Sequence, residues 1–272
     1  MTRDKVLLSA FLFLLNLSCE KILGPSSSGN EIYITKFDVE AMIKKYLPDF
    51  KLVRETARWR EGKEFLFENV NGKNSTIFIR VGIHSSKIKA QEIAEEYNSW
   101  CWIIPREDSL GTLGIGERSW WMPNVDSPDT VAYHFIRNNT FIITNSHTYP
   151  NLLSLTKAID KDLTNGADYI KKSKSISLPE IKSITTPKAE LGEEESTKVT
   201  VNAFDPKNEQ LEYVCHPGLI HGDNDPENVF TFIASRDYIP EPFWGKHILK
   251  FIVVNESNVI SEEAESEIII SE

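Results

Sequence analysis

The sequence contains too little cysteine, glycine and proline for several specialised classes of protein. Its three cysteines cannot form the disulfide framework of a small secreted domain. Its 13 glycines and 13 prolines are too few for a fibrous or repetitive chain. Long hydrophobic runs are also scarce, since only the amino terminus has one. The 14 Phe, 8 Tyr and 6 Trp nevertheless supply ample core for one large globular domain or two smaller ones.

An excess of basic residues is absent too. The chain has 30 Lys and Arg against 40 Asp and Glu, which gives a formal net charge of −10. Broad nucleic-acid binding relies on neutralising phosphate charges. The charge balance therefore argues against a nucleic-acid partner.

Motifs for catalysis and cofactor binding are missing as well. The sequence has no His-Glu-x-x-His signature, no Cys-x-x-Cys pair and no Gly-x-Ser-x-Gly nucleophile elbow. The glycines of Leu110–Gly116 follow neither the dinucleotide-binding order nor the Walker order, and the Walker lysine is absent. We therefore expect a protein that is not an enzyme and that needs no cofactor.

The amino terminus has the pattern of a secretory signal. Arg3 and Lys5 precede the apolar run Val6–Leu15, and small residues follow it. This run is shorter than the roughly 20 residues that a membrane-spanning helix needs. We expect residues 1–18 to be a cleaved signal peptide, and a buried amino-terminal helix is the alternative.

Cys19 refines this interpretation. Together with the preceding Ser18, it resembles the lipobox of bacterial lipoproteins. The resemblance implies cleavage directly before Cys19, a diacylglycerol on its thiol and a further acyl chain, such as palmitate, on the new amino terminus. Asn16 stands where the family favours Leu, with Leu15 and Leu17 on either side. A cleaved signal peptide without lipidation is therefore the alternative.

The residues after Cys19 support an anchor. Residues 19–30 end in Gly24-Pro-Ser-Ser-Ser-Gly-Asn30, a polar stretch typical of a flexible tether. Two or three acyl chains hold a protein stably at a membrane. The predicted location is the cell membrane or the outer membrane, with the protein facing the periplasm or the exterior.

Charge divides the rest of the chain into two parts. Residues 31–187 carry 21 basic and 20 acidic residues, a net charge of +1, whereas residues 188–272 carry 6 and 18, a net charge of −12. Such asymmetry indicates two separate units. We expect domains at 31–172 and 188–272, joined by a linker at 173–187 where Lys, Ser, Thr and Pro replace periodic apolar residues.

The first domain is predicted to be α+β. Helices are expected after Asp38, Ser86 and Asn151, because each can cap a helix with a periodic apolar face. Strand patterns lie between the helices, and an antiparallel sheet with helices on one face fits this order. The expected strands are Glu64–Val70, Thr76–Ile83, Val131–Ile136 and Thr140–Thr144.

Two segments of this domain resemble α+β domains of uncharacterised bacterial envelope proteins. They are Phe67–Phe78, with its Asn71-Gly72 turn, and Phe135–Ile143. The resemblance implies no catalytic motif.

The second domain is predicted to be an all-β sandwich, because short strands alternate with turn signals. Four segments resemble the Ig-like repeats of bacterial surface proteins, of the PKD and cadherin-like kind: Val199–Pro206, Leu211–Tyr213, Gly218–Gly222 and Gly245–Val254. Cys215 stands where many such repeats have a core Trp, so we expect it to be a small core residue. The expected strands are Lys198–Phe204, Gln210–Cys215, Val229–Ala234, Gly245–Val254 and Glu265–Ile270.

Tryptophans gather in the first domain, at Trp100, Trp102, Trp120 and Trp121. Neighbouring residues on a strand face opposite sides, so Trp120 and Trp121 cannot both point into one core. One of the pair is therefore a candidate for an exposed surface that binds a glycan or a protein. The alternative is that one packs in the core while the other lies under a helix or loop.

Possible metal ligands lie in the second domain. Asp205, Asp223 and Asp225 are weak candidates for binding Ca²⁺, as cadherin-like relatives do at an Asp-Pro turn. His216 and His221 could bind Zn²⁺ together with nearby carboxylates. Ordinary turns explain these residues as well, and we expect no metal.

Together these patterns predict a cell-envelope lipoprotein that acts as a non-catalytic binding or display module. Its partners would be the membrane, through the lipid on Cys19, and an envelope or external protein or a glycan. The alternative is a periplasmic small-ligand-binding or accessory subunit with a pocket in the first domain near Trp120.

Overall fold

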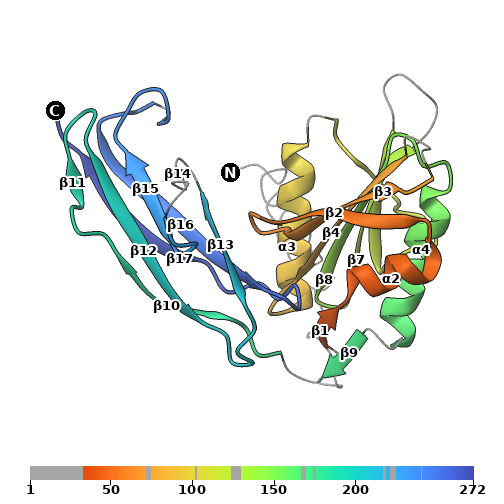
Figure 1. The fold of residues 1–272 in the computed structure, drawn as a ribbon. Coiled ribbons are helices and arrows are strands. Elements are labelled where there is room, and N and C mark those ends of the chain that lie inside the picture. The colour runs from red at the N-terminus through yellow and green to blue at the C-terminus, as the bar shows by residue number, and fades with distance from the viewer. Residues whose placement is uncertain are drawn as a thin grey trace, which may run out of the picture. The chain divides into compact units, whose positions relative to one another are not determined.

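The computed structural model describes residues 33–71, 75–101, 103–123, 130–166, 170–173, 176–216, 219–220, 225–239 and 241–272. Strands predominate in these residues, and helices are few (Figure 1). None of these helices is long and apolar enough to span a bilayer. The predicted signal peptide and tether lie outside the described residues, as do Trp102, His221 and Asp223.

A seven-stranded antiparallel sheet forms the centre of the first part of the chain, in the order β2-β3-β4-β8-β7-β6-β5. In β8 (Thr140–Asn145), Ile142 packs into one core while Phe141 and Ile143 pack into another, so the sheet is apolar on both faces. The other strands are β2 (Phe50–Arg58), β3 (Gly62–Asn69), β4 (Thr76–Ile83), β5 (Arg106–Glu107), β6 (Arg118–Pro123) and β7 (Thr130–Arg137).

Helices cover both faces of this sheet. α2 (Val39–Tyr46) and α4 (Leu152–Asn165) contribute to the core on one face, and α3 (Lys87–Trp100) contributes to the core on the other (Figure 1). The expectation of helices on one face only is wrong, because Phe141 and Ile143 give the second face an apolar surface that α3 covers.

Local sequence explains where α2 and α3 begin, whereas Asn151 precedes α4 as expected but its side chain forms no cap hydrogen bond. The Asp38 carboxylate accepts a hydrogen bond from the Ala41 N–H (2.8 Å) at the start of α2. The Ser86 hydroxyl accepts one from the Lys89 N–H (3.1 Å) at the start of α3. Both residues satisfy an N–H group that a helix otherwise leaves free, as their side chains predict.

A short ribbon lies beside the first of these cores. β1 (Tyr33–Phe37) pairs antiparallel with β9 (Ile170–Ser173), and Ile34 and Phe37 are buried among residues of α2, α4 and the sheet. The ribbon joins the beginning of the described chain to the end of its first part.

Two four-stranded sheets form the second part of the chain. Side chains of both sheets, such as Val199, Phe232, Phe251 and Ile268, share one core, so the sheets pack face to face. One sheet contains β10 (Glu180–Thr185), β12 (Ser196–Phe204), β15 (Val229–Ile233) and β14 (Leu219–Ile220). The other contains β11 (Glu190–Leu191), β17 (Ala264–Ile270), β16 (Gly245–Asn255) and β13 (Leu211–His216).

The second part begins earlier than the sequence predicts. β10 lies inside the predicted linker 173–187 and pairs with β12. Its Ile181 and Ile184 pack against the sandwich core. Two half-buried apolar residues spaced by polar ones gave too weak a pattern to be recognised as a strand.

Candidate functional site

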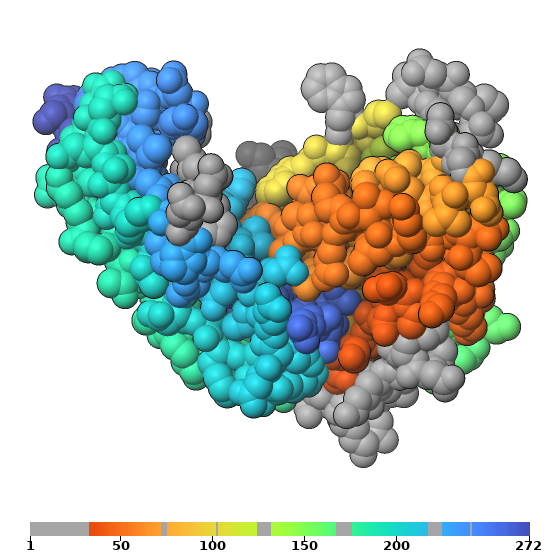
Figure 2. Space-filling view, in the orientation of Figure 1, coloured from red at the N-terminus to blue at the C-terminus, as the bar shows by residue number. Residues whose placement is uncertain are grey.

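A loop of the sandwich is built into the first part of the chain. This joint loop, residues 255–261, begins at the last residue of β16 and leads toward β17. It carries Val259, which is fully buried in the core under α2 and α4. The Ile83 N–H donates to the Asn258 carbonyl and the Ile260 N–H donates to the Ile83 carbonyl, each at 3.0 Å. The loop therefore pairs with the end of β4 as an added strand would. Figure 2 shows the dark blue atoms of the carboxyl-terminal region directly against the orange and red atoms of the amino-terminal strands.

Buried amide side chains hold this joint loop in place. Asn258 takes the left-handed conformation that Asn tolerates (φ 67), and its Nδ2 donates to the Phe37 carbonyl at 2.8 Å. The Asn139 Nδ2 donates to the carbonyls of Ile34 (3.1 Å) and His84 (2.8 Å) beside it. These amide donors are therefore satisfied within the fold, whereas the buried Asn258 Oδ1 has no hydrogen-bond partner in the described structure.

A buried ion pair connects the two parts of the chain. The buried Lys63 ammonium of β3 lies 2.7 Å from Glu55 and 2.6 Å from Glu212 of the sandwich. Burial alone would lower the pKa of Lys63, but its hydrogen bonds to Glu212 and Glu55 outweigh burial and raise it. Lys63 therefore stays charged and links the two parts.

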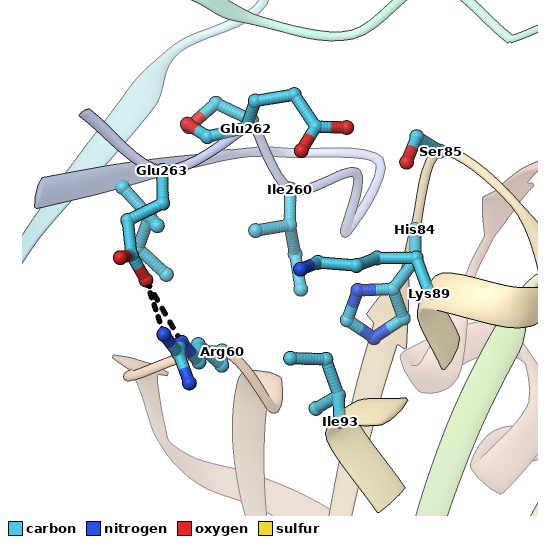
Figure 3. Close-up of a pocket in the computed structure, with 10 residues that line it drawn as sticks. Arg60, His84, Ser85, Lys89, Ile93, Ile260, Glu262 and Glu263 are labelled. Carbon is cyan, nitrogen blue, oxygen red and sulfur yellow. Dashed lines mark hydrogen bonds and ion pairs between the residues drawn. The ribbon is translucent and has the colours of Figure 1, made fainter. Parts of the chain in front are cut away.

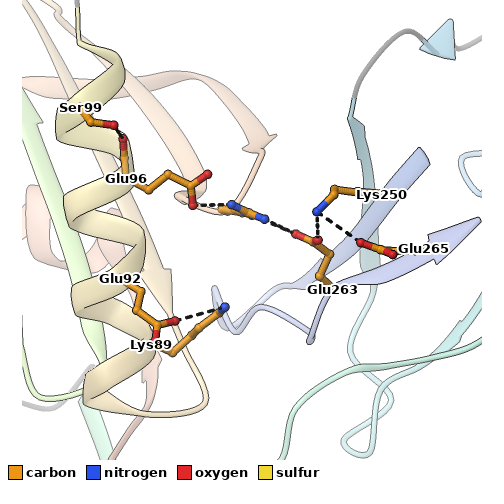
Figure 4. A network of polar contacts seen from close by, with 8 residues as sticks. Lys89, Glu92, Glu96, Ser99, Lys250, Glu263 and Glu265 are labelled. Carbon is orange, nitrogen blue, oxygen red and sulfur yellow. Dashed lines mark hydrogen bonds and ion pairs between the residues drawn. The ribbon is translucent and has the colours of Figure 1, made fainter. Parts of the chain in front are cut away.

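A second ionic cluster connects α3 to the sandwich (Figure 4). The Arg60 guanidinium pairs with Glu96 of α3 and donates from Nε to Glu263 at 3.0 Å. Lys250 of β16 pairs with the same Glu263 at 2.7 Å and with Glu265 at 3.3 Å. Residues 32–272 thus form one compact unit, and the contacts of the joint lie inside it.

A small pocket opens beside the joint (Figure 3). Its empty space is about 350 Å³, including open solvent at the mouth. The His84 imidazole lines it, and the buried Nε2 of His84 has no hydrogen-bond partner in the described structure. Burial and the nearby Lys89 charge lower the pKa of His84 to about 3, so its ring is neutral at physiological pH. The pocket is lined by Arg60, His84, Ser85, Lys89, Ile93, Ile252, Ile260, Ser261, Glu262 and Glu263.

The structure places Trp120 and Trp121 on opposite faces of β6, and neither is a freely exposed indole. Trp120 is 5% exposed, packs under α3 and has the Arg118 guanidinium 4.9 Å from its ring centroid. Trp121 is half-buried against the other core, with the Arg106 guanidinium at 5.1 Å. The expected exposed binding surface at this pair is therefore not formed, because α3 and the neighbouring strands cover the indoles.

Exposed apolar side chains lie instead on the last residue of α3 and on the segment that follows it. We name residues 100–101 and 103–110 the apolar loop. Trp100 is 59% exposed, Ile104 76% and Leu110 87%. Sequence reasoning identified Trp100 as one of a cluster but gave Ile104 and Leu110 no role, because no periodic pattern shows which apolar loop residues lie outside the core.

Asp205, the first Ca²⁺ candidate, has a structural role. It is buried, and its Oδ1 accepts the N–H groups of Lys207 (2.7 Å) and Glu209 (3.2 Å) in the turn that it begins. Its Oδ2 accepts from the Asn255 Nδ2 at 2.9 Å, which connects the turn to the joint loop. Asp225 forms an ion pair with Lys198. Within the described ranges, no three His, Cys, Asp or Glu side chains are grouped to hold a metal ion.

The remaining candidates are separated from one another. His216 stacks on Trp59 of the first part, with ring centroids 5.5 Å apart. Cys101 and Cys215 are both free thiols. Burial raises the pKa of Cys215, which fits a small residue beside the sandwich core. Cys19 lies outside the described residues.

Comparison with known proteins gives structural neighbours only. No family model matches the chain, and no curated protein matches it. Solved structures with partial similarity include tandem Ig repeats of Dlar (8% identity, 56% of this chain and 88% of that chain, TM-score 0.26). Fibronectin(III)-like modules of CbhA from Clostridium thermocellum match at 12% identity over 61% of this chain and 94% of that chain, with a TM-score of 0.25. The ectodomain Ig1–Ig3 of mouse nectin-like molecule 4 matches at 8% identity over 90% of each chain, with a TM-score of 0.24. The neighbours are thus Ig-like or fibronectin III-like domains.

Proposed function

We propose that this chain is a bacterial cell-envelope lipoprotein that acts as a non-catalytic binding or display module. In this proposal, lipid on Cys19 holds the protein at a membrane, and an α+β domain and an Ig-like sandwich form the displayed body. The sequence from Arg3 to Asn30 supports the anchor, since a basic start, an apolar run, a Ser-Cys pair and a polar tether follow one another.

The joint loop is the structural observation that carries the display role. A flexible connection would let the two parts turn independently of each other. Here Val259 is buried in the first core, and Lys63 and Arg60 form ion pairs across the joint. In this proposal, these contacts hold the surfaces of the two parts in a fixed relation, which lowers the entropy lost when a partner binds.

The alternative function, small-ligand binding, is favoured by one observation. The unpartnered His84 Nε2 lines the pocket beside the joint, together with the apolar Ile93, Ile252 and Ile260. A few polar groups in an apolar hollow are typical of ligand sites. The hollow lies at the joint and not near Trp120, where the sequence predicted it.

Detergent phase partitioning tests the proposed anchor. Wild-type protein produced in a bacterium is expected to enter the detergent phase of Triton X-114, because acyl chains partition with the detergent. The Cys19→Ser variant has no thiol to acylate, so most of it is expected in the aqueous phase or as unprocessed precursor. The measurement is an immunoblot of both phases.

Cys101→Ser is the matched control, because it removes a half-buried thiol with the same substitution. It should partition as the wild type does. A Cys19→Ser protein that is processed normally and still enters the detergent phase would contradict the proposal.

A further inference from the structure

In the apolar loop, Trp100, Ile104 and Leu110 are exposed to solvent, while the carboxylates are occupied within the fold. Glu107 pairs with Arg118, the Nε lying 2.6 Å from Glu107 Oε1. Asp108 accepts hydrogen bonds from Thr112 N (2.9 Å), Thr112 Oγ1 (2.8 Å) and Leu113 N (2.7 Å). The loop therefore combines exposed apolar groups with carboxylates that are already neutralised or hydrogen-bonded.

In the turn after Leu110, Gly111 and Gly114 lie at open positions, while Leu113 packs against the core. Gly111 and Gly114 both have left-handed backbones (φ 66 and 65), and a Cβ added at either would contact nothing within 4 Å. Among the described residues, β5 is also the edge strand of its sheet and pairs with β6 alone. Ile104 and Leu110, which flank this edge strand, thus lie where a flat surface could reach them.

We infer that the apolar loop is a second membrane contact, in which Trp100, Ile104 and Leu110 insert into the interface of the bilayer that carries the lipid anchor. This inference rests on the proposed anchor. Trp prefers the boundary between headgroups and acyl chains, and Ile and Leu lose exposed apolar area when they enter it. Arg106, stacked on Trp121, supplies a cation beside the headgroups.

The tether favours a lipid surface as the occupant. Residues 20–32 separate Cys19 from Tyr33, and such a segment spans at most about 45 Å when extended. A body held this close to a bilayer meets lipid at a high effective concentration, so a few apolar side chains suffice for contact. A protein partner would have to be present in addition, and nothing in the loop selects one.

Fluorescence quenching by brominated lipid tests the inference on the mature, lipidated chain. The protein is reconstituted into vesicles of phosphatidylcholine and phosphatidylglycerol with or without bromine on the acyl chains. Bromine quenches only indoles that reach the acyl region. We expect clear quenching of the wild type, a smaller effect in Trp100→Phe, and loss of most quenching in the pair Ile104→Ser with Leu110→Ser.

The matched control is the pair Val53→Ser with Val70→Ser, which removes two other exposed apolar side chains and should leave the quenching unchanged. Thermal unfolding of all variants checks that the body stays folded.

Vesicle flotation separates the proposed lipid anchor from the proposed second membrane contact. A wild type that does not float overturns the anchor and this inference with it. A wild-type protein that floats, but is quenched no more than the variant with Ile104→Ser and Leu110→Ser, overturns this inference alone.

Discussion

Replacing Val259 by aspartate is expected to lower the free energy of unfolding by about 4 kcal/mol. Val259 lies on a hairpin loop of the sandwich, yet it is fully buried in the core under α2 and α4. Losing a buried Val costs roughly 1.5–3 kcal/mol, and an unpaired carboxylate at the same place adds a desolvation penalty. Chemical denaturation followed by far-UV circular dichroism measures the change.

Val53→Asp is the matched control, since Val53 lies on the edge strand β2 and is 48% exposed. It should change stability by no more than about 0.5 kcal/mol. If Val259→Asp were equally mild, the joint loop would be exposed to water and the two parts would not form one unit.

Replacing Glu64 by alanine is expected to cost about 2–3 kcal/mol, because a buried carboxylate loses its charge-assisted hydrogen bonds to partly exposed arginines. Glu64 on β3 is 4% exposed and is surrounded by arginines. Its carboxylate lies 2.7 Å from Arg80 and 2.5 Å from Arg58. Arg80 also donates to the Tyr97 hydroxyl at 3.0 Å. Alanine at position 64 would leave the Arg80 guanidinium in the fold without the Glu64 carboxylate that pairs with it.

Two further measurements separate charge from packing at Glu64. The pair Glu64→Met with Arg80→Met should recover most of the loss, because an apolar pair can replace a buried ion pair at little cost. A double variant as unstable as Glu64→Ala would show that packing, not charge, dominates.

The pH dependence has a defined sign. Burial alone would raise the pKa of Glu64, but the hydrogen bonds from Arg58 and Arg80 outweigh it and lower the pKa below the usual 4.5. The carboxylate therefore stabilises the fold above about pH 4.5, and this contribution is lost as the pH falls through the lowered pKa. The difference between wild type and Glu64→Gln should shrink accordingly in acid.

Local patterns predict the helices and the longer strands. Asp38 and Ser86 act as N-caps in the structure because capping depends only on residues three positions apart. The alternation of Ile77, Ile79 and Val81 likewise predicts β4. The short strands β11 and β14, with two residues each, carry no such pattern and are seen only through their pairing.

The joint could not be predicted from the sequence. Val259 and Ile83 are far apart in the chain, and their pairing depends on where the first core leaves a gap. The signal that was available is local: two apolar residues, Val259 and Ile260, follow directly on the turn Asn255-Glu-Ser-Asn258. An apolar pair at the tip of a hairpin indicates a contact outside its own sheet. It does not indicate which residues are contacted.

Trp120 and Asp205 show the same limit for the candidate sites. Alternation on β6 predicts that the two indoles face opposite sides, but not that α3 covers the second face. The Asp-Pro turn predicts an oxygen-rich loop, but not that Asn255 and two backbone N–H groups occupy the carboxylate. In both cases, residues distant in sequence decide whether the side chain is available to a ligand.

The mass of the mature amino-terminal peptide, isolated from membranes and measured by mass spectrometry, tests the lipoprotein proposal most directly. We expect a chain that begins at Cys19 and is heavier than its sequence by a diacylglycerol and one fatty acyl group. A mature chain that begins at another residue, or one that begins with an unmodified Cys19, would contradict it.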